Sequence, residues 1–295
     1  MFATRSNRAI FALVGASFLY GATFVVVKSA LEDLEPMSFV AWRFTLGAIA
    51  LGVLAVPREK TLWTHGTAAG VLLFLGYALQ TAGLQSTSAS NSALITGMYV
   101  VLTPLIVAIL ARRLPRAWVM AGAAIAFVGV VLLTGVDGLS LSGGNLLTLG
   151  CALAFAAHIV IVSHQAHLHA VVPYTAVQLA VTAALAFPAA LILEGSVPLP
   201  PRDVWGALLL TGLGVSGGAY LLQVWAQTVI GASSAAVILA AEPAFGVATG
   251  WVVLGERLDL TGWLGAVLIM VAIFMVITNQ RDVPSKEAEA VTPGY

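Results

Sequence analysis

The stretch from Ala232 to Leu258, ASSAAVILAAEPAFGVATGWVVLGERL, decides the fold. It is about as long as a bilayer's hydrocarbon core is thick, because about 20 apolar residues in a helix span that distance. Its middle holds one carboxylate, Glu242, followed by Pro243, which removes a backbone donor and loosens a helix. A carboxylate at that depth costs about 2.5 kcal/mol or more. The stretch therefore predicts a transmembrane helix whose acid faces a partner or a cavity.

An earlier part of the chain carries the same pattern. Moving back by 144 residues (232 − 88 = 144) lays the segment from Ser88 to Leu114, SASNSALITGMYVVLTPLIVAILARRL, on the segment that begins at Ala232. Ser90 then falls on Ser234, and both segments end in Arg-Leu. The chain is therefore predicted to be a doubled unit with one such helix in each half.

The composition is that of a membrane protein. Of 295 residues, 60% are hydrophobic and 9% are charged, whereas a soluble domain carries about 25% charged residues. Thirteen basic and thirteen acidic residues cancel, so no basic excess indicates a nucleic-acid partner. The single cysteine, Cys151, excludes an intrachain disulfide and offers no metal cluster. We expect no cofactor and no bound metal.

Ten apolar segments are predicted to cross the bilayer as helices. Their approximate limits are 9–28, 37–56, 66–84, 88–111, 118–135, 145–163, 173–193, 204–228, 233–254 and 261–279. The predicted fold is an all-α polytopic membrane protein. Residues 1–143 form a first five-helix repeat, residues 144–280 form a second, and the polar tail 281–295 is expected to be disordered.

The remaining predicted helices also match between the halves. The matched pairs are Gly15 with Gly150, Val27 with Val162, Pro36 with Pro173, Val40 with Val177, Tyr77 with Tyr220, and Gln80 with Gln223. Each unit has an odd number of helices, so the second unit enters the membrane upside down. Inverted repeats are a construction found in many transporters, which place the substrate near the midplane between the halves.

The distribution of basic loop residues predicts the orientation, because such residues are enriched on the cytoplasmic side. Nine lie on the side of the N-terminus, and three lie on the other side, namely Lys28, Arg202 and Arg257. Arg43 lies inside the second helix and is not counted. We expect a bacterial inner-membrane protein with both termini in the cytoplasm.

Several motifs resemble the EamA family of the drug/metabolite transporter superfamily. They are Tyr20-Gly21 in the first helix, Trp42-Arg43-Phe44 in the second, residues 87–91 before the fourth, Glu242-Pro243 in the ninth, and the Gly-Glu-Arg-Leu turn that follows. The resemblance covers residues 9–279 and is nearest to YddG-type amino-acid exporters. It implies ten helices and the export of amino acids, drugs or other metabolites. The first half departs from the pattern, with Met98-Tyr99 in place of Glu-Pro.

Polar side chains recur at helical spacing within predicted membrane helices, which indicates faces turned to protein or water. One such stripe is Ser216, Tyr220, Gln223 and Gln227 on the eighth helix. A stripe of this kind either lines a cavity or forms interhelical hydrogen bonds, worth about 0.6 kcal/mol each. We favour a cavity. The candidate substrate-binding residues are Tyr20, Tyr77, Gln80, Asn91, Tyr99, His158, Tyr220, Gln223 and Glu242.

Two charged side chains at depth allow more than one interpretation. Glu242 is a proton carrier, a partner for a substrate ammonium, or a protonated carboxyl bonded to a neighbouring helix. Because the family motif recurs over many substrates, a structural or gating role is favoured. Arg43 either takes a substrate carboxylate or extends to the interface or to backbone carbonyls, and the second interpretation is preferred.

The histidines are interpreted in a similar way. His158 lies in the middle of the sixth helix, where proton coupling is conceivable because histidine titrates near neutral pH. A packed, hydrogen-bonded histidine is the more ordinary interpretation. His164, His167 and His169 follow the same helix, and polar interface residues are preferred there over a metal site.

Prolines and glycines give further expectations about the helices. Pro104, Pro188 and Pro243 lie inside predicted helices, so kinks are expected there. The Gly214–Gly218 and Gly246–Gly250 pairs allow close helix approach, and we expect them to pack within one chain rather than in a dimer.

The predicted function is secondary transport of small uncharged or zwitterionic solutes, such as apolar or aromatic amino acids, by alternating access. The partners are then a small-molecule substrate and the lipid bilayer. No Walker motif is present, so ATP hydrolysis is not expected. A small-multidrug-type or other metabolite transporter is the alternative. An intramembrane enzyme is disfavoured, because acids and histidines are few and scattered.

Overall fold

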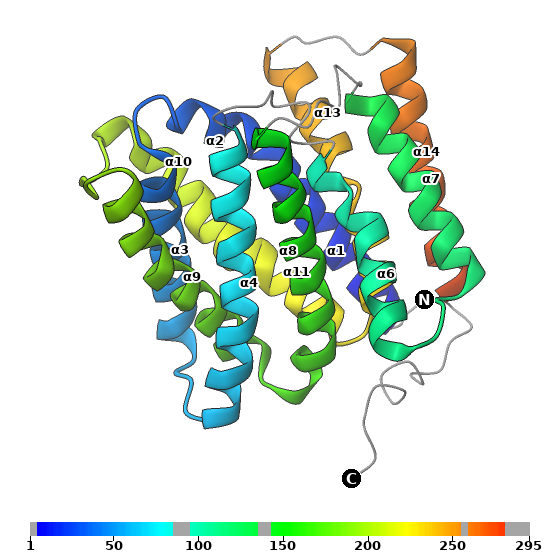
Figure 1. The fold of residues 1–295 in the computed structure, drawn as a ribbon, viewed down its shortest axis with the longest axis horizontal. Coiled ribbons are helices and arrows are strands. Elements are labelled where there is room, and N and C mark those ends of the chain that lie inside the picture. The colour runs from blue at the N-terminus through cyan, green and yellow to red at the C-terminus, as the bar shows by residue number, and fades with distance from the viewer. Residues whose placement is uncertain (1–4, 85–94, 135–142, 255–258, 281–295) are drawn as a thin grey trace.

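The computed structural model describes residues 5–84, 95–134, 143–254 and 259–280, and the described part is helical (Figure 1). The proposed tail and Asn91 lie outside these ranges. The α-helices are α1 (Arg5–Ala22), α2 (Phe24–Ala30), α3 (Pro36–Leu54), α4 (Lys60–Leu84), α6 (Tyr99–Ala111), α7 (Ala117–Thr134), α8 (Gly143–Gln165), α9 (Val171–Leu193), α10 (Trp205–Leu209), α11 (Tyr220–Gln227), α12 (Ala232–Leu239), α13 (Glu242–Leu254) and α14 (Leu260–Gln280). Three further elements are the short 3₁₀-helices η1 (Ala166–Leu168) and η2 (Arg202–Val204) and the π-helix η3 (Leu210–Ala219).

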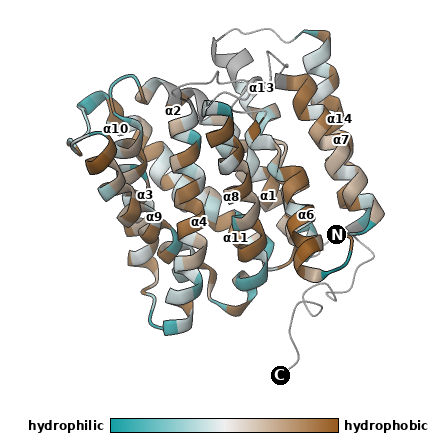
Figure 2. Cartoon of the chain, in the orientation of Figure 1, coloured by the Kyte–Doolittle hydropathy of each residue, from teal (hydrophilic) through white to brown (hydrophobic). Residues whose placement is uncertain are grey.

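These elements form ten helical spans, as the hydropathy pattern predicts. The first span is α1 with α2, the eighth is α10 with η3 and α11, and the ninth is α12 with α13. Six spans in the described chain are long and apolar enough to cross a membrane unaided. Hydrophilic residues gather at the helix ends and connections, while hydrophobic residues cover the helix sides (Figure 2). The chain is therefore an all-α polytopic membrane protein.

The packing of the spans repeats itself about a two-fold axis. The contact of α4 with α8 joins the third and sixth spans, and its equivalent, α11 with α1, joins the eighth and first spans. Likewise, α4 with α9 joins the third and seventh spans, and η3 with α3 joins the eighth and second spans. α3 with α9, α6 with α12, and α7 with α14 each join equivalent spans. Each span and its equivalent are five positions apart in the chain, an odd number, so they cross in opposite directions and the two repeats are inverted relative to each other.

The equivalent fourth and ninth spans are interrupted at equivalent places. α12 ends at Leu239 and α13 begins at Glu242, while a turn at Met98 precedes α6. The 144-residue offset lays Met98 on Glu242 (242 − 98 = 144). The first span is also interrupted, at Thr23. Interrupted helices within a membrane are tolerated where the freed backbone groups face protein or a water-filled cavity.

The three prolines lie at helical positions. Pro243 follows the interruption of the ninth span as the second residue of α13. α6 and α9 run as helices through Pro104 and Pro188. The expected kinks stay a prediction, because a continuous helix can still bend at a proline.

Glycines bring several helix backbones close together. A Cβ added at Gly21 would lie 2.7 Å from the backbone nitrogen of Gly246, so α1 and α13 approach closely, as expected for Gly246. The expectation for Gly214 and Gly218 is wrong, because a Cβ at either position would contact only atoms of its own span. Gly212 makes the close approach instead, because a Cβ added there would lie 2.9 Å from the carbonyl oxygen of Arg43.

The α7–α14 pair offers a direct test of such packing. A Cβ at Gly129 would lie 2.8 Å from the carbonyl oxygen of Gly265, whereas a Cβ at Gly52 would meet nothing within 4 Å. Both glycines are helical, so alanine brings both the same gain in helix propensity, up to about 1 kcal/mol. We expect Gly129→Ala to lower the free energy of unfolding by about 1–3 kcal/mol and Gly52→Ala to leave it unchanged or raised. Melting curves of the purified variants would contradict this if the two alanines behaved alike.

Candidate functional site

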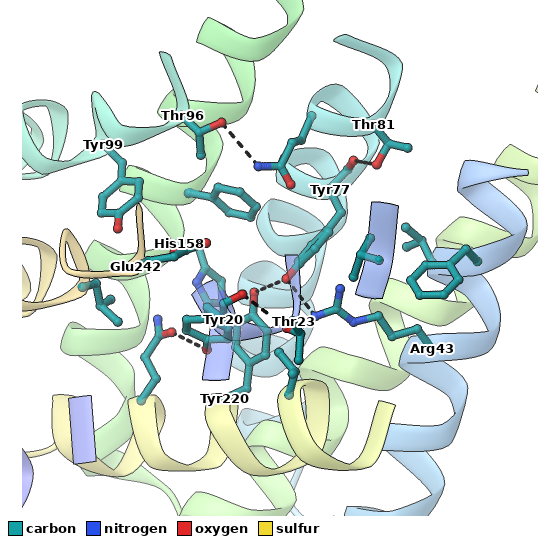
Figure 3. Close-up of a pocket in the computed structure, with 18 of the residues that line it drawn as sticks. Tyr20, Thr23, Arg43, Tyr77, Thr81, Thr96, Tyr99, His158, Tyr220 and Glu242 are labelled. Atoms are coloured by element: carbon teal, nitrogen blue, oxygen red, sulfur yellow. Dashed lines mark hydrogen bonds between the residues drawn. The ribbon is translucent and has the colours of Figure 1, made fainter. Parts of the chain in front are cut away.

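A cavity of about 410 Å³ lies among the first, second, third, fourth, sixth, eighth and ninth spans (Figure 3). It contains the two-fold axis, and its lining extends through Val27 and Pro36 toward the end of the bundle opposite the N-terminus. Toward the N-terminal end, the same spans close into a core that includes Leu13, Ile159 and Ile238. The candidate residues chosen from the sequence lie on six of these spans, and the second span carries none of them.

The structure brings eight of the nine candidate residues to this cavity. They are Tyr20, Tyr77, Gln80, Tyr99, His158, Tyr220, Gln223 and Glu242. The ninth, Asn91, lies outside the described residues. Sequence reasoning did not select four polar lining residues, Thr23, Arg43, Thr81 and Thr96, or the aromatic Phe155. A role of any of these residues in binding stays a prediction.

Two equivalent tyrosines contact each other at the axis. The Tyr220 hydroxyl donates to the Tyr77 hydroxyl at 3.1 Å. Tyr20 packs against Tyr220 with ring centroids 5.3 Å apart, and Phe155 packs against Tyr77 at 5.4 Å. The offset that matches Gly15 with Gly150 (150 − 15 = 135) also matches Tyr20 with Phe155. The centre of the cavity is therefore an aromatic quartet built from two copies of one pair.

Arg43 reaches into the cavity from α3, which corrects the preferred sequence interpretation. Its Nε donates to the Ser216 hydroxyl at 2.9 Å, and its Nη2 donates to the Tyr77 hydroxyl at 3.4 Å. The guanidinium carbon lies 5.1 Å from the Tyr77 ring centroid. These partners are neutral side chains, and the guanidinium forms no ion pair within the described part of the chain. Its positive charge remains available to an anionic group in the cavity.

The π-helix explains how Ser216 reaches Arg43. η3 runs through ten residues of the eighth span and contacts α3. Its wider turns change the facing of side chains relative to an α-helix, and π-helical segments are frequent at functional sites. Ser216 is fully buried beneath the guanidinium. Sequence periodicity alone could not indicate this pairing, because it assumes α-helical spacing.

Glu242 supplies the opposite charge. It lies in the first turn of α13, where the helix dipole favours a carboxylate. Figure 3 shows Glu242 and Arg43 at opposite sides of the cavity, with tyrosines between them. Among the described residues, no hydrogen bond reaches the Glu242 carboxylate. The hypothesis of a carboxyl bonded to a neighbouring helix therefore has no support in the described contacts.

Several other polar side chains of the cavity wall form hydrogen bonds within the protein. Gln80 donates to the Thr96 hydroxyl at 3.3 Å, and the Nε2 of His158 lies 2.9 Å from the side-chain oxygen of Gln178. The Tyr20 hydroxyl donates to the side-chain oxygen of Gln223 at 2.7 Å. These bonds orient the amides and the imidazole at the cavity wall.

The polar stripe of the eighth helix divides between two roles. Tyr220 and Gln223 line the cavity, as predicted. Gln227 does not, because its amide donates to the carbonyl oxygen of Ile159 at 2.8 Å and to the Ser163 hydroxyl at 2.7 Å. At Gln227 the stripe is therefore an interhelical bond rather than a cavity wall.

One of the expected interface histidines, His169, forms an unforeseen pair with His65. The Nδ1 of His65 lies 2.8 Å from the Nε2 of His169, which also stacks on Tyr174. Partial burial lowers the pKa of His169 below the ordinary value of histidine, and the neighbouring His65 lowers it further. Within the described ranges, no group of three or more His, Cys, Asp or Glu side chains could hold a metal ion.

Comparisons with known proteins identify the family. A sequence model of the EamA-like transporter family matches residues 7–135 and 142–278. An uncharacterized transporter of Archaeoglobus fulgidus is 33% identical over 261 residues, which are 88% of this chain and 82% of that protein. The uncharacterized transporter YwfM of Bacillus subtilis is 28% identical over 291 residues, 95% of this chain and 96% of YwfM. One solved crystal structure has the same fold, with a TM-score of 0.77, 20% identity, and coverage of 93% of this chain and 99% of that chain.

The two axial tyrosines should contribute unequally to stability. The Tyr77 hydroxyl accepts from Arg43 and from Tyr220, whereas the Tyr220 hydroxyl only donates to Tyr77. We expect Tyr77→Phe to cost about 2 kcal/mol, because a hydrogen bond to a charged group is lost. Tyr220→Phe should cost about 0.6 kcal/mol, as an average interhelical bond does. The double variant should melt like Tyr77→Phe alone in a double-mutant cycle, and additive losses would contradict the pairing.

Proposed function

The chain belongs to the EamA-like transporter family, and we propose that it exports small zwitterionic solutes, in particular amino acids with apolar or aromatic side chains, by alternating access. One observation carries the proposal. The cavity presents an uncompensated guanidinium, Arg43, and a carboxylate without a hydrogen-bond partner among the described residues, Glu242, on opposite sides of an aromatic quartet. A zwitterionic solute carries a carboxylate, which complements Arg43, and an ammonium, which complements Glu242, a few covalent bonds apart.

The chemistry of the wall fits each part of such a solute. A guanidinium can bind a carboxylate through two parallel hydrogen bonds, which makes Arg43 the partner for the acid end. The Glu242 carboxylate is then the partner for the ammonium. Aromatic faces at Tyr20, Tyr220 and Phe155 provide apolar surface for a side chain.

The size and charge of the cavity narrow the substrate class. A volume of about 410 Å³ is near the lower end of the roughly 300–1,000 Å³ typical of ligand pockets. Arg43 is the one arginine or lysine among the described lining residues. A phosphorylated solute would need more than one cation for its charge. A single small solute without net charge is therefore the best match.

We further propose the topology that follows from the basic residues. Nine of them on the N-terminal side against three on the other support cytoplasmic termini in a bacterial inner membrane. In this orientation the cavity lining extends toward the exterior. Residues 1–143 and 144–280 are then the two inverted units, with 281–295 as a cytoplasmic tail. The resemblance to YddG-type exporters supports the outward direction of transport.

Arg43 provides the sharpest test of the substrate class. In proteoliposomes, Arg43→Gln should raise the KM for a neutral aromatic amino acid by about 10- to 100-fold, because a charge-assisted bond of about 1.5–3 kcal/mol is lost. Arg202→Gln is the matched control, since Arg202 is exposed in η2 and outside the cavity. In the unmodified protein, an amine that matches this amino acid but lacks its carboxylate should compete poorly for transport. An unchanged KM in Arg43→Gln, with normal melting, would exclude Arg43 as the carboxylate partner.

A further inference from the structure

His158 turns one ring nitrogen to the protein and the other to the cavity. Its Nε2 lies 2.9 Å from the side-chain oxygen of Gln178, a residue of α9 that is 1% exposed. In the described part of the chain, the Nδ1 of His169 is the one enclosed side-chain nitrogen or oxygen that lacks a hydrogen-bond partner. The Nδ1 of His158 has no partner there either, so it is not enclosed, and it opens into the cavity that His158 lines.

The contacts of Gln178 determine which of these two ring nitrogens carries the hydrogen. The Gln178 amide nitrogen donates to the backbone carbonyl oxygen of Tyr174 at 3.3 Å. A carbonyl oxygen only accepts, so the side-chain oxygen of Gln178 is the atom that faces His158, and it can only accept as well. Nε2 therefore carries the hydrogen of the neutral imidazole, and Nδ1 presents a lone pair to the cavity.

This arrangement has no counterpart in the first repeat. The offset of 135 that relates the aromatic pairs (158 − 135 = 23) lays His158 on Thr23, and the offset of 137 between the second and seventh spans (178 − 137 = 41) lays Gln178 on Ala41. The Thr23 hydroxyl donates to the carbonyl oxygen of Leu19 at 2.8 Å, so its hydrogen is used within its own span. Alanine has no polar side-chain atom. The lone pair is therefore a feature of one side of the cavity and not a product of the two-fold axis.

The lone pair and the nearest acid recognise different properties of a cation. Figure 3 shows His158 on the same side of the cavity as Glu242, with Arg43 on the opposite side. The Glu242 carboxylate attracts any cationic group, with or without N–H bonds. A neutral lone pair instead stabilises only a group that donates a hydrogen to it. A primary ammonium has three such donors, whereas a quaternary ammonium has none.

We infer that His158 is a specificity-determining residue, whose Nδ1 accepts a hydrogen bond from the ammonium of the solute and thereby selects primary over quaternary ammonium groups. Gln178 is the positioning residue that holds the imidazole in the required tautomer. Without this selection, the aromatic faces of Tyr20 and Tyr220 would also suit a quaternary ammonium, since such cations bind over aromatic rings. The inference rests on the proposed function, because it concerns the ammonium end of the same zwitterion.

The tautomer can be measured without transport. In protein that carries isotopically labelled histidine, nuclear magnetic resonance distinguishes a ring nitrogen with a hydrogen from one without. The chain has five histidines, and the signals of His158 are those that disappear in the His158→Phe/Gln178→Leu double variant. At neutral pH we expect an Nδ1 without hydrogen, whose signal shifts when phenylalanine is added. Gln178→Leu alone should populate the other tautomer, with the hydrogen on Nδ1.

The selectivity is measured in proteoliposomes as the KM of N,N,N-trimethylphenylalanine divided by the KM of phenylalanine. The double variant replaces both bonded partners by apolar side chains, so it leaves neither one buried without the other and should fold. It should lower the KM ratio by about tenfold, because a hydrogen bond to a charged group is lost for phenylalanine alone.

Tyr174→Phe is the matched control. It removes a buried bond between the same two helices, from the Tyr174 hydroxyl to Gln165, outside the cavity. The backbone carbonyl that receives the Gln178 amide is unchanged. This variant should leave the KM ratio as it is, even where it lowers the melting temperature.

Three outcomes overturn the inference. They are an Nδ1 that carries a hydrogen in the solute-free protein, a KM ratio that the double variant does not lower, and an equal fall of that ratio with Tyr174→Phe. An unchanged tautomer in Gln178→Leu rejects the positioning role of that residue.

These failures differ from a failure of the proposed function. Flux that depends on Arg43, together with an unchanged KM ratio in the double variant, retains the zwitterionic substrate and rejects the role of His158. A His158 signal that shifts with phenylethylamine but not with phenylalanine retains the ammonium subsite and rejects the zwitterionic substrate.

Discussion

The hydrocarbon core of a bilayer contains no water, so each polar group placed there must find its partner within the protein or a cavity. This constraint explains why phenols, amides, an imidazole and two charges from seven spans meet in one place. Tyr77, Tyr220 and Gln223 would be costly against lipid, and at the axis they bond to one another or to neighbouring spans. The apolar faces cover the outside of the bundle, as Figure 2 shows.

The repeat provides the scaffold, and departures from the repeat provide the chemistry. The aromatic quartet and the α7–α14 contact through Gly129 and Gly265 obey the two-fold axis. The two charged side chains do not obey the axis, since Glu242 corresponds to Met98 in the first half. The offset that matches Pro36 with Pro173 (173 − 36 = 137) lays Arg43 on Ala180. A symmetric cavity therefore carries one cation and one acid, which distinguishes the two ends of a bound solute.

Much of this arrangement could be predicted from the sequence, because the cost of polar groups in lipid acts on every residue at depth. Hydropathy located the ten spans, and periodicity located most of the polar wall. Arg43 was misjudged because its partner Ser216 reaches it from a π-helix, a spacing that α-helical periodicity does not contain. Gln223 and Gln227 belong to the same polar stripe, but Gln223 lines the cavity and Gln227 bonds to another helix. The residue pattern along one span cannot distinguish a cavity-lining amide from an interhelical one. The His65–His169 pair joins residues far apart in the chain.

The interruptions in the fourth and ninth spans connect the scaffold to movement. An unbroken helix holds its two ends in one orientation, because each backbone bond fixes the next turn. A break at Met98 and at the residues before Glu242 places a joint on each side of the axis, at the depth of the cavity. The half-spans on either side of a joint are therefore not held in one orientation by continuous backbone bonds, whereas α7 with α14 and α3 with α9 pack as unbroken helices. Equivalent joints in both repeats are what the alternating access proposed for this chain would require of its two halves.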